Sequence, residues 1–105
     1  MEPEQLQQAA FLAKSLSDMN RLRILHCISS EQKSVSAIVE ELGLSQPLVS
    51  HHLKELKHSL LVTVERQGPF IYYELADTRI LDVVEMLIQV ATDLISGRKI
   101  LNKRK

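Results

Sequence analysis

The sequence predicts a mainly helical domain with a β-hairpin wing, the winged helix-turn-helix fold, which dimerises through its first and last helices. Three observations predict it. Two amphipathic segments are joined around Gly43, a hairpin pattern follows at 61–75, and the last helical segment is apolar over most of its circumference. The chain has 105 residues, of which 45% are hydrophobic and 25% charged, so we expect one small globular domain spanning 1–105.

Two helices are predicted before the helix-turn-helix. The first covers about 4–16, where small and apolar residues recur at helical spacing. Asp18 can cap the second, which reads MNRLRILHCIS and should place Leu22, Leu25 and Ile28 in the core. The polar connection 29–33 contains neither glycine nor proline, so its boundaries stay open.

The stretch 34–58 predicts two helices joined by a tight turn. A short helix ends at Gly43, and Ser45 is a good N-cap for the next because its hydroxyl can accept a first-turn N–H. Pro47 falls in the first turn of that helix, where a missing N–H costs little. The apolar side of the second helix, at near-helical spacing, should consist of Leu48, Val49, His52, Leu53, Leu56 and Leu60.

The exposed side of the second helix has a composition that suits DNA. Such a helix can lie in a major groove, with hydrogen-bonding groups near its N-terminus meeting base edges and later cations meeting phosphates. An ordinary helical hairpin with a polar surface is the alternative. The candidate DNA-binding side chains here are Gln46, Ser50, His51, Lys54 and Lys57.

A wing is predicted at 61–75. The β-branched run 61–67 reads as a strand, Gly68 and Pro69 form a turn, and 70–75 reads as the returning strand. Neighbouring strand residues point to opposite faces, so of Tyr72 and Tyr73 one should be in the core and the other exposed.

The last predicted helix covers 79–96, capped by Asp77 or Thr78 and ending near Gly97. Its polar residues form one narrow stripe, and a helix that is apolar elsewhere must be buried on two sides. Two-fold dimerisation through this helix and the first is the economical solution, whereas a monomer would have few elements left to surround it. The basic tail 99–105 should be frayed, touching phosphate or nothing.

Composition narrows the functional classes. The formal net charge is zero, so any affinity for nucleic acid should be moderate and salt-sensitive. The single cysteine, Cys27, fits a reducing compartment, and neither a signal-peptide core nor a membrane-length apolar run is visible, which favours a cytoplasmic protein without a membrane partner. The usual catalytic and cofactor motifs are missing, so we expect neither an enzyme nor a bound cofactor.

Three stretches together resemble the ArsR/SmtB family of repressors: LSDMNRLRIL at 16–25, LGLSQPLVSHHLKEL at 42–56 and VERQGPFIYYEL at 64–75. The resemblance covers nearly the whole chain. It implies a homodimer that occupies a double-stranded DNA operator and releases it when a ligand binds. The family's DNA-facing positions fall on Ser45, Gln46, Ser50, His51 and Lys54, with wing contacts near Arg66 and Gln67.

The sequence departs from the family pattern at several places. Met19 replaces a common proline, and Pro69 stands where the wing tip often has a basic residue. The Cys-x-Cys metal ligands correspond to Ser34 and Ser36, whose hydroxyls cannot replace soft thiolates. A second zinc site is also disfavoured, since its ligand positions are Asp77, Arg79, Val90 and Asp93.

The remaining candidate ligands offer no metal site. His51 and His52 are neighbours on a helix and diverge by about 100°, so they cannot share a metal, and His52 is expected to be packed in the structure. Cys27 is a candidate redox or sulfur-sensing thiol, although a small packed residue is the favoured interpretation. The inducer is unknown.

We therefore expect a repressor that binds an inverted-repeat operator as a homodimer, with half-sites about 34 Å apart, and that responds to an unidentified signal other than the usual metals. The alternative is a winged-helix protein-interaction module without DNA binding. The neutral net charge and Pro69 support that alternative. The polar first turn of the second helix opposes it, because interaction surfaces favour aromatic or apolar anchors.

Overall fold

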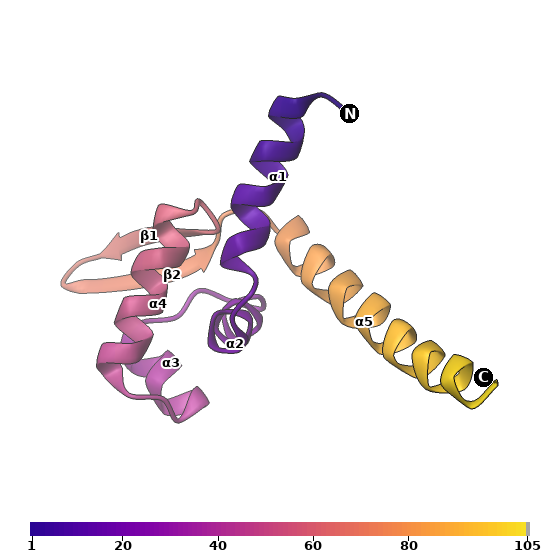
Figure 1. Cartoon of the computed structure of the whole chain (residues 1–105). Helices are drawn as coiled ribbons and strands as arrows, with labels where there is room; N and C mark the ends of the chain where they lie inside the picture. The colour runs from indigo at the N-terminus through magenta and orange to yellow at the C-terminus, as the bar shows by residue number, and fades with distance from the viewer. Residues whose placement is uncertain (105) are drawn as a thin grey trace.

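The computed structural model describes residues 1–104, and side chains over 1–97. Helices α2, α3 and α4 and the β1–β2 hairpin form the body, from which α1 and α5 project (Figure 1). This is the predicted winged helix-turn-helix arrangement. The elements in chain order are α1 (Pro3–Ser15), α2 (Met19–Cys27), α3 (Val35–Leu42), α4 (Gln46–His58), β1 (Val62–Gln67), β2 (Phe70–Leu75) and α5 (Arg79–Arg104).

The core lies where α2 packs on α3 and α4, and the hairpin joins it through contacts of β1 with α4 and of β2 with α3. Leu25 and Ile28 are buried as predicted, whereas Leu22 is only half-buried at its edge. Ile24, which the prediction omitted, is fully buried because α3, α4 and α5 all contact α2 and widen its buried side. The other buried apolar residues are Leu16, Cys27, Ile38, Val49, Leu53, Leu56, Leu61, Val62 and Val84.

Short polar side chains start the helices of the body. Asp18, Ser34 and Ser45 cap α2, α3 and α4, each accepting a hydrogen bond from the backbone N–H three residues later. Gly43 ends α3 with a φ of 67°, a left-handed conformation that glycine adopts without a Cβ penalty. The predicted cap at Ser45 and turn at Gly43 are confirmed.

Helix α4 ends at His58, so the prediction that Leu60 belongs to its apolar side was wrong. Leu60 has a φ of 68° and is 70% exposed. Its N–H bonds the Lys57 carbonyl at 3.1 Å, and the Leu61 N–H bonds the Leu56 carbonyl at 2.9 Å. These two bonds form a Schellman motif, which packs Leu61 against Leu56 and turns Leu60 outward.

The wing is a two-stranded antiparallel hairpin whose register pairs Gln67 with Phe70 across the Gly68–Pro69 turn. Gly68 has a φ of 62°, which suits the first central position of a two-residue hairpin turn. Tyr73 packs against the core as one of the two tyrosines should. Tyr72 is half-buried rather than exposed, because its ring lies beside that of Phe70 at a centroid distance of 6.4 Å.

The polar connection before α3 contains a short extension of the sheet. Lys33 forms an antiparallel bridge with Tyr73, with N···O distances of 3.0 and 2.8 Å for the two backbone hydrogen bonds. The sequence between 29 and 33 has no strand pattern, so this pairing could not be predicted from local propensity.

Among its side chains up to residue 97, helix α5 contacts the core only through its first turns, where Val84 is buried and Ile80 is half-buried. It continues through Gly97 to Arg104, so the predicted end near Gly97 was wrong. Gly97 lacks the positive φ of a glycine helix end, and a glycine inside a helix costs only about 1 kcal/mol relative to alanine. The side chains of the basic tail lie outside the described residues.

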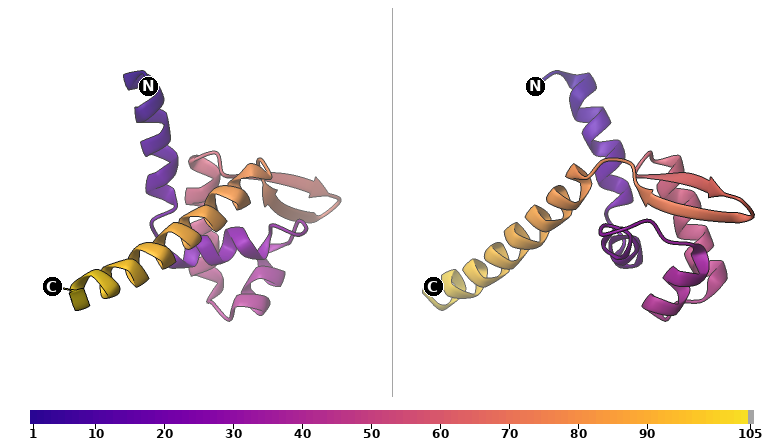
Figure 2. Two further views of the ribbon diagram at one scale, coloured as in Figure 1. Left: turned by 90° about the vertical axis from the view of Figure 1, so that its right-hand side faces the viewer. Right: turned by 180° about the vertical axis from the view of Figure 1, so that it is seen from behind.

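The projecting helices make the single chain extended. Both views in Figure 2 show α1 and α5 leaving the body in different directions. The radius of gyration is 16.4 Å, against about 13 Å for a compact domain of this length. No residue of α1 is buried, and the exposed apolar side chains include Leu6, Phe11, Val83, Met86, Leu87, Val90 and Leu94.

Candidate nucleic-acid interface

The polar stripe predicted on α4 lies on one exposed face of the helix. Gln46, Ser50 and Lys54 follow one another at intervals of four residues, and Lys57 comes three residues later. His51 is exposed beside this stripe, and Ser45 is exposed at the cap. The structure therefore brings six of the candidate DNA-binding residues together on the surface of one helix.

The opposite face of α4 is firmly packed. Val49 and Leu56 are fully buried, and Leu53 is 1% exposed, so the helix cannot rotate without opening the core. His52 is also buried, which confirms the prediction that it is a packed residue. This anchoring fixes which side chains α4 presents to solvent.

His52 connects α4 to the start of α2. Its Nε2 lies 3.9 Å from Oδ1 of Asp18, while its Nδ1 has no hydrogen-bond partner among the described side chains. The Arg21 backbone N–H bonds the Asp18 carboxylate and is the main reason why the pKa of Asp18 lies below its ordinary value. The charged cap of α2 thus lies next to the buried face of α4.

Two arginines of α2 hold the ends of neighbouring helices, and the sequence analysis missed both roles. The Nη2 of Arg23 donates to the Leu42 carbonyl at the end of α3, at 2.8 Å. The Nε of Arg21 donates to the Ser15 carbonyl at the end of α1, at 2.7 Å. Their partners are backbone carbonyls, which any residue supplies, so no motif identifies these contacts.

The two candidate wing residues are exposed, but they lie on opposite faces of the hairpin. Arg66 alternates with Val62 and Val64, whose face packs on the body, whereas Gln67 shares the outer face with its cross-strand partner Phe70. Arg66 is therefore the wing cation on the same side of the hairpin as the helices. The two side chains cannot make equivalent contacts with one surface.

Two of the four positions that match the family's second zinc site form an ion pair instead. The Nη2 of Arg79 lies 2.8 Å from Oδ2 of Asp77. Hydrogen bonds from the Arg79 side chain, followed by one from its backbone N–H, lower the pKa of Asp77 to about 2. Within the described part of the chain, no three His, Cys, Asp or Glu side chains are grouped closely enough to hold a metal ion.

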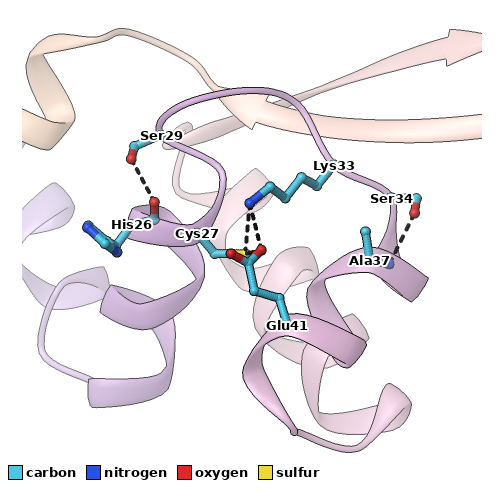
Figure 3. Close-up of polar contacts among 7 residues, drawn as sticks. All are labelled: His26, Cys27, Ser29, Lys33, Ser34, Ala37 and Glu41. Atoms are coloured by element: carbon cyan, nitrogen blue, oxygen red, sulfur yellow. Dashed lines mark hydrogen bonds and ion pairs between the residues drawn. The ribbon is translucent and has the colours of Figure 1, made fainter.

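Cys27 is packed between α2 and α3 (Figure 3). The residue is 5% exposed, and its thiol donates a hydrogen bond to Oε2 of Glu41 at 2.8 Å. Burial, and then the Glu41 carboxylate, raise the pKa of the thiol to about 11. A thiol in this state is a poor nucleophile, which favours the packed role over the redox role.

The same carboxylate oxygen of Glu41 is 2.6 Å from Nζ of Lys33, which also lies 3.7 Å from the sulfur of Cys27. The hydrogen bonds from Cys27 and Lys33 lower the pKa of Glu41. The sequence analysis did not single out Lys33 or Glu41. They are 8 residues apart and in no motif, so only the fold identifies the contact.

The comparisons with known proteins find transcriptional regulators. The family described as "Bacterial regulatory protein, arsR family" matches residues 18–64. The transcriptional repressor SdpR of Bacillus subtilis is 33% identical over 75 residues, covering 71% of this chain and 83% of the relative. The HTH-type transcriptional repressor SmtB of Mycobacterium tuberculosis is 38% identical over 81 residues, covering 77% of this chain and 60% of the relative.

A solved structure extends the similarity to the fold. The homodimeric winged helix-turn-helix DNA-binding domain of a possible ArsR-family regulator from Mycobacterium bovis superposes with a TM-score of 0.77 at 28% identity. The match covers 90% of this chain and 87% of that one. These proteins are DNA-binding regulators rather than enzymes. Among the described residues, no helix is long and apolar enough to cross a membrane.

Proposed function

The chain belongs to the ArsR/SmtB family of transcriptional repressors, and on that basis we propose that two copies bind an inverted-repeat operator through α4 and the wing. Helix α4 enters the major groove. Ser45 and Gln46 anchor or read at the groove, Ser50 and His51 contact bases or phosphates, and Lys54 and Lys57 bind the backbone. Arg66 contacts the duplex from the wing, and Gln67 belongs to the outer edge of that contact.

One observation carries the proposal: the polar face of α4 is exposed while its other face is immobilised in the core. Base reading needs side chains held in a fixed register, and a buried face provides it. The order along the helix, with uncharged hydrogen-bonding groups first and lysines later, suits base edges and then phosphates. Because the net charge is zero, the salt dependence of DNA binding should come from the cations at the interface, Lys54, Lys57 and Arg66.

The proposed homodimer forms through α1 and α5. Beyond its first turns α5 is exposed in the single chain, with Met86 and Leu94 62% and 67% exposed. An apolar helix of this kind needs a partner, and a second copy supplies the same apolar face. Two-fold symmetry then places the two α4 helices in successive major grooves, with half-sites about 34 Å apart.

A protein-interaction module without DNA binding is the second candidate function. Phe70 at the wing tip is 60% exposed and Ile71 is 36% exposed, which makes them potential anchors for a protein partner. Pro69 beside them stands where the wing tip of family members often has a basic residue, which weakens the case for a phosphate contact there. The exposed residues of α4, by contrast, include no large apolar side chain.

The proposal includes release of the operator by a signal other than the usual metals. Ser34 caps α3, and Asp77 is paired with Arg79, so both occupy structural roles at positions where family members bind metal. A cytoplasmic location is part of the proposal.

The test is DNA binding by His51→Ala, measured by fluorescence anisotropy on the duplex that the wild-type protein selects from randomised DNA. The variant should lose about 1–3 kcal/mol of specific binding if His51 reads a base. His26→Ala is the matched control, because His26 is another exposed histidine, on α2. Equal affinities for the wild type and His51→Ala would remove this residue from the interface.

A further inference from the structure

We propose that Lys33 is a positioning residue that fixes the wing against the helix-turn-helix, so that Arg66 and α4 meet the duplex in one geometry. This inference rests on the proposed function. Lys33 lies in the connection between α2 and α3 and would not itself touch DNA. Its backbone is bonded to the wing, and its side chain is bonded to both helices that flank the connection.

The backbone of Lys33 is tied to β2 in both directions. Its N–H donates to the Tyr73 carbonyl at 3.0 Å, and the Tyr73 N–H donates to the Lys33 carbonyl at 2.8 Å. The next residue, Ser34, caps α3 by accepting from the Ala37 N–H at 3.2 Å. The wing strand and the first helix of the helix-turn-helix are therefore bonded to consecutive residues.

The side chain of Lys33 connects this residue to α2 and α3 as well (Figure 3). Nζ is 2.6 Å from Oε2 of Glu41 on α3, and 3.7 Å from the sulfur of Cys27 on α2. Cys27 donates to the same Glu41 oxygen at 2.8 Å. The Lys33 side chain is only 14% exposed, so these contacts hold it in one orientation and limit screening by water.

The Lys33–Tyr73 bridge lies nearer the core than Arg66 and the wing tip do. Arg66 pairs with Ile71, two residues beyond Tyr73 toward the wing tip, or about 7 Å at strand spacing. The tip of the hairpin lies further out, and Phe70 there is largely exposed. A small rotation of the hairpin at Tyr73 therefore moves Arg66 by a larger distance than it moves the core. Fixing Tyr73 fixes the direction in which the wing points.

The test is a double-mutant cycle on the selected duplex. Lys33→Met keeps the apolar stem and the backbone bonds while removing the ammonium, and Arg66→Ala removes the wing contact. We expect Lys33→Met alone to weaken binding about 3- to 10-fold, and the double variant to bind no more weakly than Arg66→Ala alone. Losses that multiply in the double variant would overturn the inference, because they would mean that Lys33 does not act through the wing.

A measurement without DNA separates this inference from the proposed function. Amide hydrogen exchange at Tyr73 should be faster in Lys33→Met, whereas exchange at Leu53, in the buried face of α4, should be unchanged. The charge-swapped variant Lys33→Glu with Glu41→Lys should slow Tyr73 exchange again relative to Lys33→Glu alone. Unchanged Tyr73 exchange in Lys33→Met would contradict the inference, even if the wild type binds its operator. If the wild type selects no duplex, the proposed function fails while the exchange result still tests the bridge.

Discussion

The surroundings of Cys27 favour an unreactive thiol. Its pKa rises from an ordinary 9.0 to about 11, because burial and the Glu41 carboxylate disfavour the thiolate. The thiol serves instead as a hydrogen-bond donor between two helices. A sequence with a single cysteine leaves its role open, and here the neighbours from α3 and the connection favour the packed role.

The reactivity of Cys27 is directly measurable. At pH 8, alkylation by iodoacetamide should be about 100-fold slower in the folded protein than in denaturant, because the pKa shift reduces the thiolate fraction by about that factor. Burial adds a steric barrier in the same direction. Equal rates in the folded and unfolded states would show that the thiol is accessible, and would favour the sensor role.

Asp77 predicts a dependence of stability on pH. Its pKa in the folded state is about 2, below the ordinary 3.8, so folding favours the ionised carboxylate paired with Arg79. The stabilisation is fully present above about pH 4 and is lost as the pH falls toward 2. Urea unfolding of wild type and Asp77→Asn should therefore differ near pH 6 and converge near pH 2.

The matched variant is Arg79→Ala, which leaves the carboxylate and removes its partner. It should abolish the same pH-dependent difference, apart from the backbone N–H bond that remains at residue 79. A constant difference between wild type and Asp77→Asn from pH 6 to pH 2 would show that the ion pair is not the source of the stabilisation.

The structural roles of some residues could be predicted from the sequence, whereas those of others could not. The caps at Asp18 and Ser45 follow from local rules, since each side chain bonds a backbone group three residues away. Lys33 could not be assigned, because its partners Glu41 and Tyr73 are brought to it only by the fold. Local chemistry is visible in a sequence, whereas long-range polar contacts are not.

At the scale of elements, Ser45 sets the start of the helix that carries the candidate interface. Ser45→Ala should lower the free energy of unfolding by about 1 kcal/mol, because the Leu48 N–H loses its acceptor. Thermal or urea unfolding measures the effect. Ser45→Asp keeps an acceptor at this position and should restore most of the stability, whereas equal losses in both variants would show that the cap contributes little.

The ends of helices were less predictable than their faces. The period of α4 correctly placed Val49, Leu53 and Leu56 in the core, but it wrongly continued to Leu60. The left-handed φ at Leu60, where glycine is usual, arises from the Schellman bonds rather than from the residue itself. Gly97 is the opposite case. A glycine is typical of a helix end, but the backbone of α5 continues as helix through this residue.

At the scale of the whole molecule, the proposed homodimer accounts for the exposed apolar surfaces of α1 and α5. Leu87→Glu should convert the dimer to a monomer at micromolar concentration in sedimentation experiments. Leu87 is 48% exposed in the single chain, so covering the rest contributes about half of the roughly 1.5–3 kcal/mol of a fully buried side chain, and does so twice in a symmetric interface.

Gln89→Glu is the control for this prediction. It introduces the same charge on the polar stripe of α5, where Gln89 already bonds Asp93, and it should leave the dimer intact. If Leu87→Glu remains dimeric, then the α5 face is not the interface. The sequence predicts a dimer from the composition of this helix, because so few other elements could not cover its whole circumference.

The most direct test of the central claim is selection of duplexes from a randomised DNA pool by the wild-type protein, followed by sequencing. We predict enrichment of an inverted repeat whose half-sites are centred about one helical turn apart, with binding that weakens as salt is raised. Retention of all sequences without enrichment would contradict sequence-specific recognition by α4. Failure to retain any duplex would contradict it too, and would favour the protein-interaction function.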